Sequence, residues 1–149
     1  MFLEARKFVS SFSNAEQYQE LLKSAGFRNG DLPHSNFATI NIEAMYWRKV
    51  NAVHDWFVRE VQGGEDDCGT YRVSREQLQE LVSLCNKVLL AADEETAQEL
   101  LPTASGFFFG GTDYEEYYYE GLSWTVEGLT KILQNPAFDS MEFYYSSSW

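Results

Sequence analysis

Apolar side chains at helical spacing near the carboxyl end of the sequence are the feature that most constrains the fold. Over about residues 113–134 they recur every three or four positions, which places them on one face of an α-helix. The stripe consists of Tyr114, Tyr118, Leu122, Thr125, Leu129, Ile132 and Leu133. Thr112 or Asp113 can cap this helix, with Glu115 or Glu116 at the reciprocal position. The pattern predicts a long helix with one face against a core.

Three shorter segments also carry helix signals. Ser74 and Gln77 match a capping box, in which each side chain bonds the other residue's backbone N–H, and an apolar stripe follows. That stripe is Leu78, Leu81, Val82, Cys85, Val88 and Leu89. Ser13 and Glu16 make the same pattern ahead of a helix to about Ala25. Residues 93–101 predict an acidic helix that Pro102 ends.

A fifth helix is predicted over about residues 43–62, and it carries the candidate polar groups. A helical projection places Tyr46, Trp47, Val50, Val53, Phe57, Val58 and Val61 on one wide apolar face. His54 falls in the middle of that face and Asn51 at its edge, while Arg48 and Trp56 project from the other side. His54 is therefore either a hydrogen-bonded core histidine or a group that faces a ligand.

Strand signals are fewer and shorter. Residues 2–9, 37–42 and 141–145 are bounded by turn residues and are rich in aromatic and β-branched side chains. An aromatic content of 16% argues for a packed core, and 149 residues suffice for one. We expect a single domain over 1–149 of the α+β class, mainly helical, with about five helices and a small two- or three-stranded sheet. An all-α bundle is the alternative.

Several large aromatic residues are left without an interior neighbour by these projections. Trp56 stands on the polar side of its helix, and Tyr117, Tyr119 and Trp124 flank the stripe of the last helix. Exposed aromatic side chains commonly anchor protein interfaces. They predict a contact surface, with substitution of Trp56 or Trp124 by alanine expected to leave folding intact.

A glycine-flanked loop offers an alternative binding site. Gly106 and the pair Gly110–Gly111 bracket three phenylalanines, of which Phe108 is the central one. Backbone N–H groups of such glycines, together with Arg48, Asn51 and His54, could hold a nucleotide-like ligand stacked on a phenylalanine ring.

Charge and cysteine content restrict the partners. A net charge of −12 disfavours direct binding to nucleic acid or to anionic membranes and favours a basic protein partner. Cys68 and Cys85 are too few for a disulfide framework and lack the spacing of a zinc site, and Cys85 is expected to be an inert core thiol. With no signal-peptide or membrane-spanning pattern, a cytoplasmic location is expected.

Catalytic and metal signatures are weak. No phosphate-binding loop, nucleophile elbow or H-E-x-x-H motif occurs. The Glu65-Asp66-Asp67 turn could hold a hard cation, but it lacks the calcium-loop pattern, and capping of its own backbone by Asp66 or Asp67 is the competing interpretation. We expect a binding protein with no cofactor or metal. An enzyme using His54 and carboxylates remains an alternative.

Four stretches carry a resemblance: YWRKVNAVHDWF, DDCGTYRVS, LLPTASGFFFGGTDYEEYYYE and the ending SSSW. Together they resemble an uncharacterised family of small proteins encoded by phages and some bacterial genomes, over about residues 46–149. The resemblance implies a setting inside a bacterial host and a role as an accessory, host-takeover or anti-defence factor. It implies no chemistry and no site residue.

Overall fold

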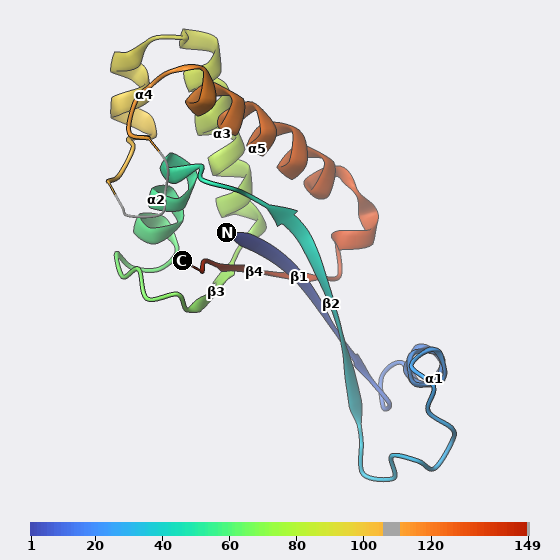
Figure 1. Ribbon diagram of the computed structural model, residues 1–149. Coiled ribbons are helices and arrows are strands. Elements are labelled where there is room, and N and C mark those ends of the chain that lie inside the picture. Colours follow the sequence, from blue (N-terminus) through green and yellow to red (C-terminus); the bar gives the residue numbers. More distant parts are fainter. Residues whose placement is uncertain (106–110, 149) are drawn as a thin grey trace. The chain divides into compact units, whose positions relative to one another are not determined.

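The chain forms five α-helices and four strands in a computed structural model that describes residues 1–105 and 111–148 (Figure 1). The elements are β1 (Phe2–Ser10), α1 (Ala15–Ser24), β2 (Phe37–Tyr46), α2 (Asn51–Glu60), β3 (Thr70–Val73), α3 (Arg75–Ala91), α4 (Glu94–Leu100), α5 (Glu116–Gln134), the 3-10 turn η1 (Pro136–Phe138) and β4 (Glu142–Ser146). The predicted α+β class, mainly helical, is confirmed.

Two compact units make up the chain. The large unit consists of Met1–Ala5 with Glu43–Trp149, and the small unit of Arg6–Ile42. Strands β1 and β2 each contribute residues to both units, and helix α1 belongs to the small unit.

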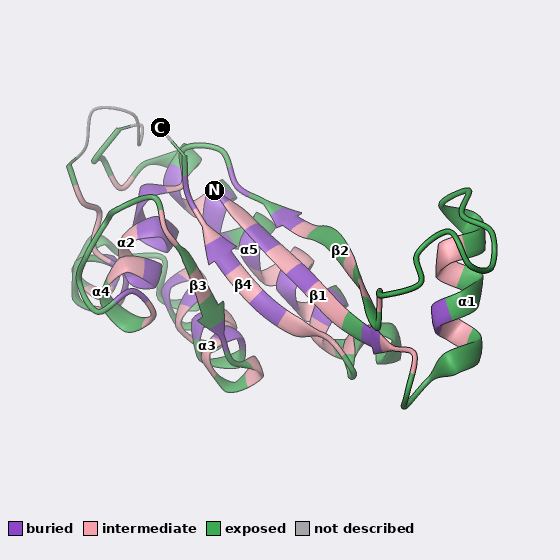
Figure 2. Ribbon diagram, turned by 90° about the horizontal axis from the view of Figure 1, so that it is seen from below, coloured by how far each residue is buried: buried purple, intermediate pink, exposed green. Residues whose placement is uncertain are grey.

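The four strands form one antiparallel sheet in the order β2-β1-β4-β3. In the β3–β4 pair, Thr70 lies opposite Ser146 and Val73 opposite Phe143. Alternate residues of β4 are buried, and the same alternation buries Leu3 and Ala5 of β1 (Figure 2). One face of the sheet therefore supplies the core of the large unit. β3 was not expected, because four residues make too short a signal.

Helices α3 and α5 lie side by side and form the largest helix contact in the large unit (Figure 1). The predicted capping box is present, since the Ser74 hydroxyl accepts from the Gln77 N–H and the Gln77 amide oxygen accepts from the Ser74 N–H. Both predicted stripes are buried. Their fully enclosed members are Leu78, Leu81, Cys85, Val88, Leu122, Thr125 and Leu129.

The predicted start of the helix at Glu43 is wrong. Glu43–Tyr46 belong to β2, and α2 begins at Asn51. The backbone amide of Trp47 donates to the Met1 carbonyl oxygen, so this segment spends its hydrogen bonds on the amino-terminal strand. Lys49, with φ of 58°, then turns the chain into the helix. Sheet pairing has overridden the apolar spacing of residues 43–50.

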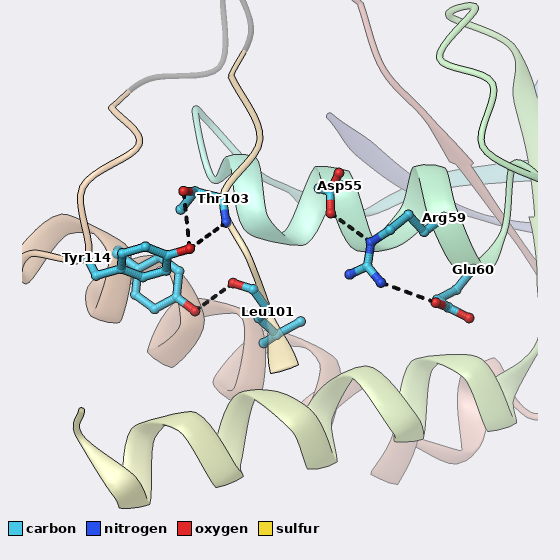
Figure 3. A network of polar contacts seen from close by, with 7 residues as sticks. Asp55, Arg59, Glu60, Leu101, Thr103 and Tyr114 are labelled. Carbon is cyan, nitrogen blue, oxygen red and sulfur yellow. Dashed lines mark hydrogen bonds and ion pairs between the residues drawn. The ribbon is translucent and has the colours of Figure 1, made fainter. Parts of the chain in front are cut away.

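The caps of two other helices also differ from expectation. Helix α5 begins at Glu116 rather than at Asp113, and Glu115 makes no side-chain cap. The residues before it are tied to Thr103, whose N–H donates to the Tyr114 hydroxyl (3.0 Å) and whose hydroxyl donates to the Thr112 carbonyl (Figure 3). Helix α1 is capped by Asn14 instead of Ser13.

The two cysteines are expected to differ sharply in reactivity. Cys68 is exposed, whereas Cys85 is enclosed between α3 and the rest of the core, and burial raises the pKa of the Cys85 thiol to about 12. A thiol reagent at mildly alkaline pH should modify one cysteine per native chain, and the second only after denaturation. Because an unfolded thiol ionises near 8.5, this group's contribution to stability is lost as pH rises above that value. Rapid modification of both thiols in the folded protein would contradict this burial.

Candidate functional site

Two large aromatic side chains stand exposed on one face of α5. Tyr117 and Trp124 are 59% and 57% exposed, as the sequence predicted. They are two helical turns apart, and Glu120 lies on the same face between them. Residues at i, i+3 and i+7 share one side of a helix, so the two rings flank a carboxylate.

A hollow of about 270 Å³ opens between these rings and the segment that joins β2 to α2. We call it the α5 hollow, and it is lined by Tyr46, Arg48, Val50, Tyr117, Glu120, Gly121 and Trp124. Its volume falls just below the range of about 300–1,000 Å³ that is usual for small-molecule sites. It has the size for one side chain of a partner rather than for a dinucleotide.

The rings of the hollow are held in place by backbone carbonyls. The Trp124 indole N–H donates to the Tyr46 carbonyl oxygen at 3.2 Å, and the Tyr117 hydroxyl reaches the Arg48 carbonyl oxygen at 3.5 Å. The second bond is long and correspondingly weak. Because both rings are oriented before any partner arrives, binding would cost less side-chain entropy.

The floor of the hollow requires a glycine. A Cβ atom at Gly121 would lie 2.8 Å from Cγ1 of Val50, a distance that forces one of them to move. Beneath this contact, the Trp47 indole donates to the Thr125 hydroxyl (2.9 Å), which donates to the Gly121 carbonyl (2.7 Å). Sequence reasoning missed Trp47 and Gly121. Only a glycine on the edge of an apolar helical stripe hinted at a close approach.

Charges around the hollow are predominantly acidic. Two neighbouring hollows, of about 470 and 180 Å³, share lining residues with it at Trp124 and at Tyr117. Carboxylates line the three hollows at Glu43, Asp113, Glu115, Glu120 and Glu127, and cations at Arg48, Lys49 and Lys131. Lys131 donates to Glu127 at 2.6 Å, a bond that lowers the pKa of that carboxyl. The surface therefore keeps an excess of negative charge.

His54 is a buried, bonded group. It is 3% exposed, with Nδ1 lying 2.6 Å from the Tyr145 hydroxyl and Nε2 3.0 Å from Asp66. Burial raises the pKa of Tyr145 above its ordinary value, and the nearby charge of Asp66 adds to this. The core interpretation of His54 fits this geometry, because a ligand would have to displace bonds that already exist.

Other predicted site residues fall in different places. Arg48 is exposed and lines the α5 hollow, whereas the buried Asn51 amide donates to the Gly111 carbonyl at 2.7 Å. Tyr119 is half-buried and packs edge-on against Tyr118. Phe108 lies outside the described residues.

The predicted exposure of Trp56 is wrong. Its side chain is 1% exposed and meets Phe57 edge-on, with 5.1 Å between the ring centroids. The projection was centred on a helix that began at Glu43, so Tyr46 and Val50 displaced the apparent apolar face. In α2 itself, Ala52, Val53, Trp56 and Phe57 all enter the core. Only the more polar side, including Asp55 and Arg59 in their 2.8 Å ion pair, remains accessible (Figure 3).

The acidic turn caps its own backbone, as one of the two interpretations predicted. Asp67 accepts from the Gly69 N–H (2.7 Å) and from the Tyr71 hydroxyl (2.9 Å), and the first of these bonds chiefly lowers the pKa of the Asp67 carboxyl. Asp66 turns instead toward His54. Within residues 1–105 and 111–148, no three potential metal-ligating side chains converge.

Comparison with known proteins gives no relative: neither a protein family, nor a curated protein, nor a solved structure is significantly similar to this chain. In the described part of the chain, no helix combines the length and apolar character needed to cross a membrane.

Proposed function

We propose that this protein is a non-enzymatic binding protein that engages a basic segment of a host protein through the α5 hollow. The arrangement of Tyr117, Glu120 and Trp124 carries the proposal, because two exposed rings flank a carboxylate on an acidic surface. The resemblance to small phage-encoded proteins supports a role as an accessory, host-takeover or anti-defence factor inside a bacterium.

The chemistry of the hollow favours a cationic side chain as the inserted group. An arginine or lysine over the face of Trp or Tyr is attracted by the ring quadrupole, most strongly where water is excluded. Glu120 is exposed on the same face, and it makes no ion pair with any residue that the structure describes. It can therefore meet the incoming charge. Arginine fits best, because its planar guanidinium can stack on a ring and bond a carboxylate together.

Arg48 is the group that opposes this assignment. Its side chain lines the same hollow and would favour an anionic ligand. The surrounding carboxylates outnumber the cations, and the chain as a whole carries −12, so the summed field attracts positive partners. Substitution of Arg48 separates the two signs: loss of its charge should tighten binding of a cation and weaken binding of an anion.

Peptide binding to the full chain tests the proposal. Arginine-containing peptides should bind, and the same peptides with citrulline, which is neutral and nearly isosteric, should bind at least about tenfold more weakly. Trp124→Ala and Tyr117→Ala should each weaken binding about tenfold or more, as expected for aromatic anchors. Glu120→Gln should reduce both affinity and its dependence on salt.

Leu90→Ala is the matched control, because Leu90 is 86% exposed on α3, away from the hollow. It should leave affinity unchanged. Equal affinity for citrulline and arginine peptides, or weaker binding in Arg48→Ala, would refute the cationic assignment. A thermal-shift screen with nucleotides tests the small-molecule alternative, whose residues His54 and Asn51 already spend their side-chain bonds inside the protein.

A further inference from the structure

The small unit exposes an unusual amount of apolar surface for its size. Of the ten large hydrophobic side chains that are exposed among the described residues, six lie within Arg6–Ile42. They are Phe8, Phe12, Phe27, Leu32, Phe37 and Ile42. Only Val9 and Tyr18 of this unit are buried. Units of fewer than about 40 residues rarely stabilise themselves without help, so this surface calls for a cover.

Strand β2 also presents an open edge. It is the outermost strand of the sheet and pairs with β1 on one side, while no described strand lies beyond it. Natural edge strands are usually blocked by charged residues, proline or bulges. The segment Phe37–Ile42 reads FATINI and contains no charge and no proline. Phe37 and Ile42, at its two ends, are both exposed. The segment has the character of a strand that pairs with another strand.

Charge separates the two units and points to the occupant. The small unit has four cations (Arg6, Lys7, Lys23 and Arg28) and three carboxylates (Glu16, Glu20 and Asp31), a formal charge of +1. The whole chain carries −12, so the large unit carries −13. Two large units repel each other, whereas two small units can approach without repulsion.

We propose that two copies of this chain associate through antiparallel pairing of their β2 segments Phe37–Ile42. Antiparallel pairing of a strand with its own copy generates a two-fold axis, and such an isologous interface closes at the dimer. The backbone bonds of the two edges supply the register, and the apolar side chains beside them supply burial. The inference does not depend on what the α5 hollow binds. A dimer would carry two such hollows and so gain avidity for a repetitive partner.

Sedimentation equilibrium of the full chain should show a reversible monomer–dimer equilibrium. Phe37→Lys and Ile42→Lys, singly and together, place a charge beside the edge and should weaken dimerisation at least about tenfold. Both side chains are exposed, so circular dichroism should show an intact fold. Leu90→Lys removes an exposed apolar side chain from α3 and should leave dimerisation unchanged.

Cross-linking locates the interface. In a Cys68→Ser background, Thr39→Cys, near the middle of the segment, should cross-link to its copy with a short bismaleimide, and Leu90→Cys should not. Cys85 is enclosed and does not interfere. A monomer at protein concentrations up to about 100 µM would overturn the proposal. So would a dimer that both lysine variants retain, or equal cross-linking at positions 39 and 90.

Discussion

Replacement of Trp56 by alanine is expected to lower the free energy of unfolding by about 3–5 kcal/mol, the usual cost of truncating a large buried aromatic side chain. The indole is fully enclosed and belongs to one core cluster with Trp47, Phe57 and Tyr145. Its removal leaves a cavity whose lining includes rigid rings in edge-on and stacked contact, which cannot collapse readily.

Trp124→Ala provides the matched comparison on an exposed tryptophan. Its loss removes one hydrogen bond to the Tyr46 carbonyl and part of a half-covered ring, for an expected cost near 1 kcal/mol. Urea denaturation followed by circular dichroism measures both variants. Equal and small effects would mean that Trp56 is not enclosed, and that the exposed face first predicted for it exists after all.

The sequence predicted the large elements of the fold because their signals are local. A capping box and an apolar stripe identified α3, and the stripe of α5 predicted which side faces the core and which flank is exposed. Tyr117 and Trp124 follow from that second projection alone. The exposed face of α5 was thus accessible without coordinates, because a long regular helix fixes the direction of every side chain along it.

Short elements with tertiary partners escaped prediction. Residues 43–47 have helix-like apolar spacing, yet Trp47 pairs with Met1 in the sheet, and no local pattern announces a partner 46 residues away. That single boundary error rotated the projected face and misplaced Trp56. The floor of the α5 hollow likewise depends on Val50 meeting Gly121, a contact set by how α5 packs on the β2–α2 connection.

The polar chain from Tyr145 through His54 to Asp66 was also beyond sequence reasoning. His54 and Tyr145 are 91 residues apart, and the predicted partners of His54 were Asn51 or a backbone carbonyl. Asn51 instead bonds Gly111. The helical projection located His54 on a buried face correctly, but only the sheet brings the end of β4 beside α2. This chain links three segments, and its energetic weight can be measured.

His54→Leu is expected to cost about 2–3 kcal/mol, because it leaves the buried Tyr145 hydroxyl without its 2.6 Å partner and breaks the contact with Asp66. Tyr145→Phe keeps the ring stacked on Phe57, with centroids 3.9 Å apart, and removes only the hydroxyl, for about 1–2 kcal/mol. Asp66→Asn, at a partly exposed carboxylate, should cost less than about 1 kcal/mol.

The double variant His54→Leu/Tyr145→Phe discriminates a real bond from mere proximity. Once the imidazole is gone, the Tyr145 hydroxyl is an unpaired buried group, so removing it should recover stability rather than lose more. The double variant should therefore be about 1–2 kcal/mol more stable than the sum of the single effects requires. Denaturant titration of the four proteins gives this coupling energy directly. Strict additivity would show that the hydroxyl and imidazole do not depend on each other, and that burial of His54 rests on packing and on its other contacts.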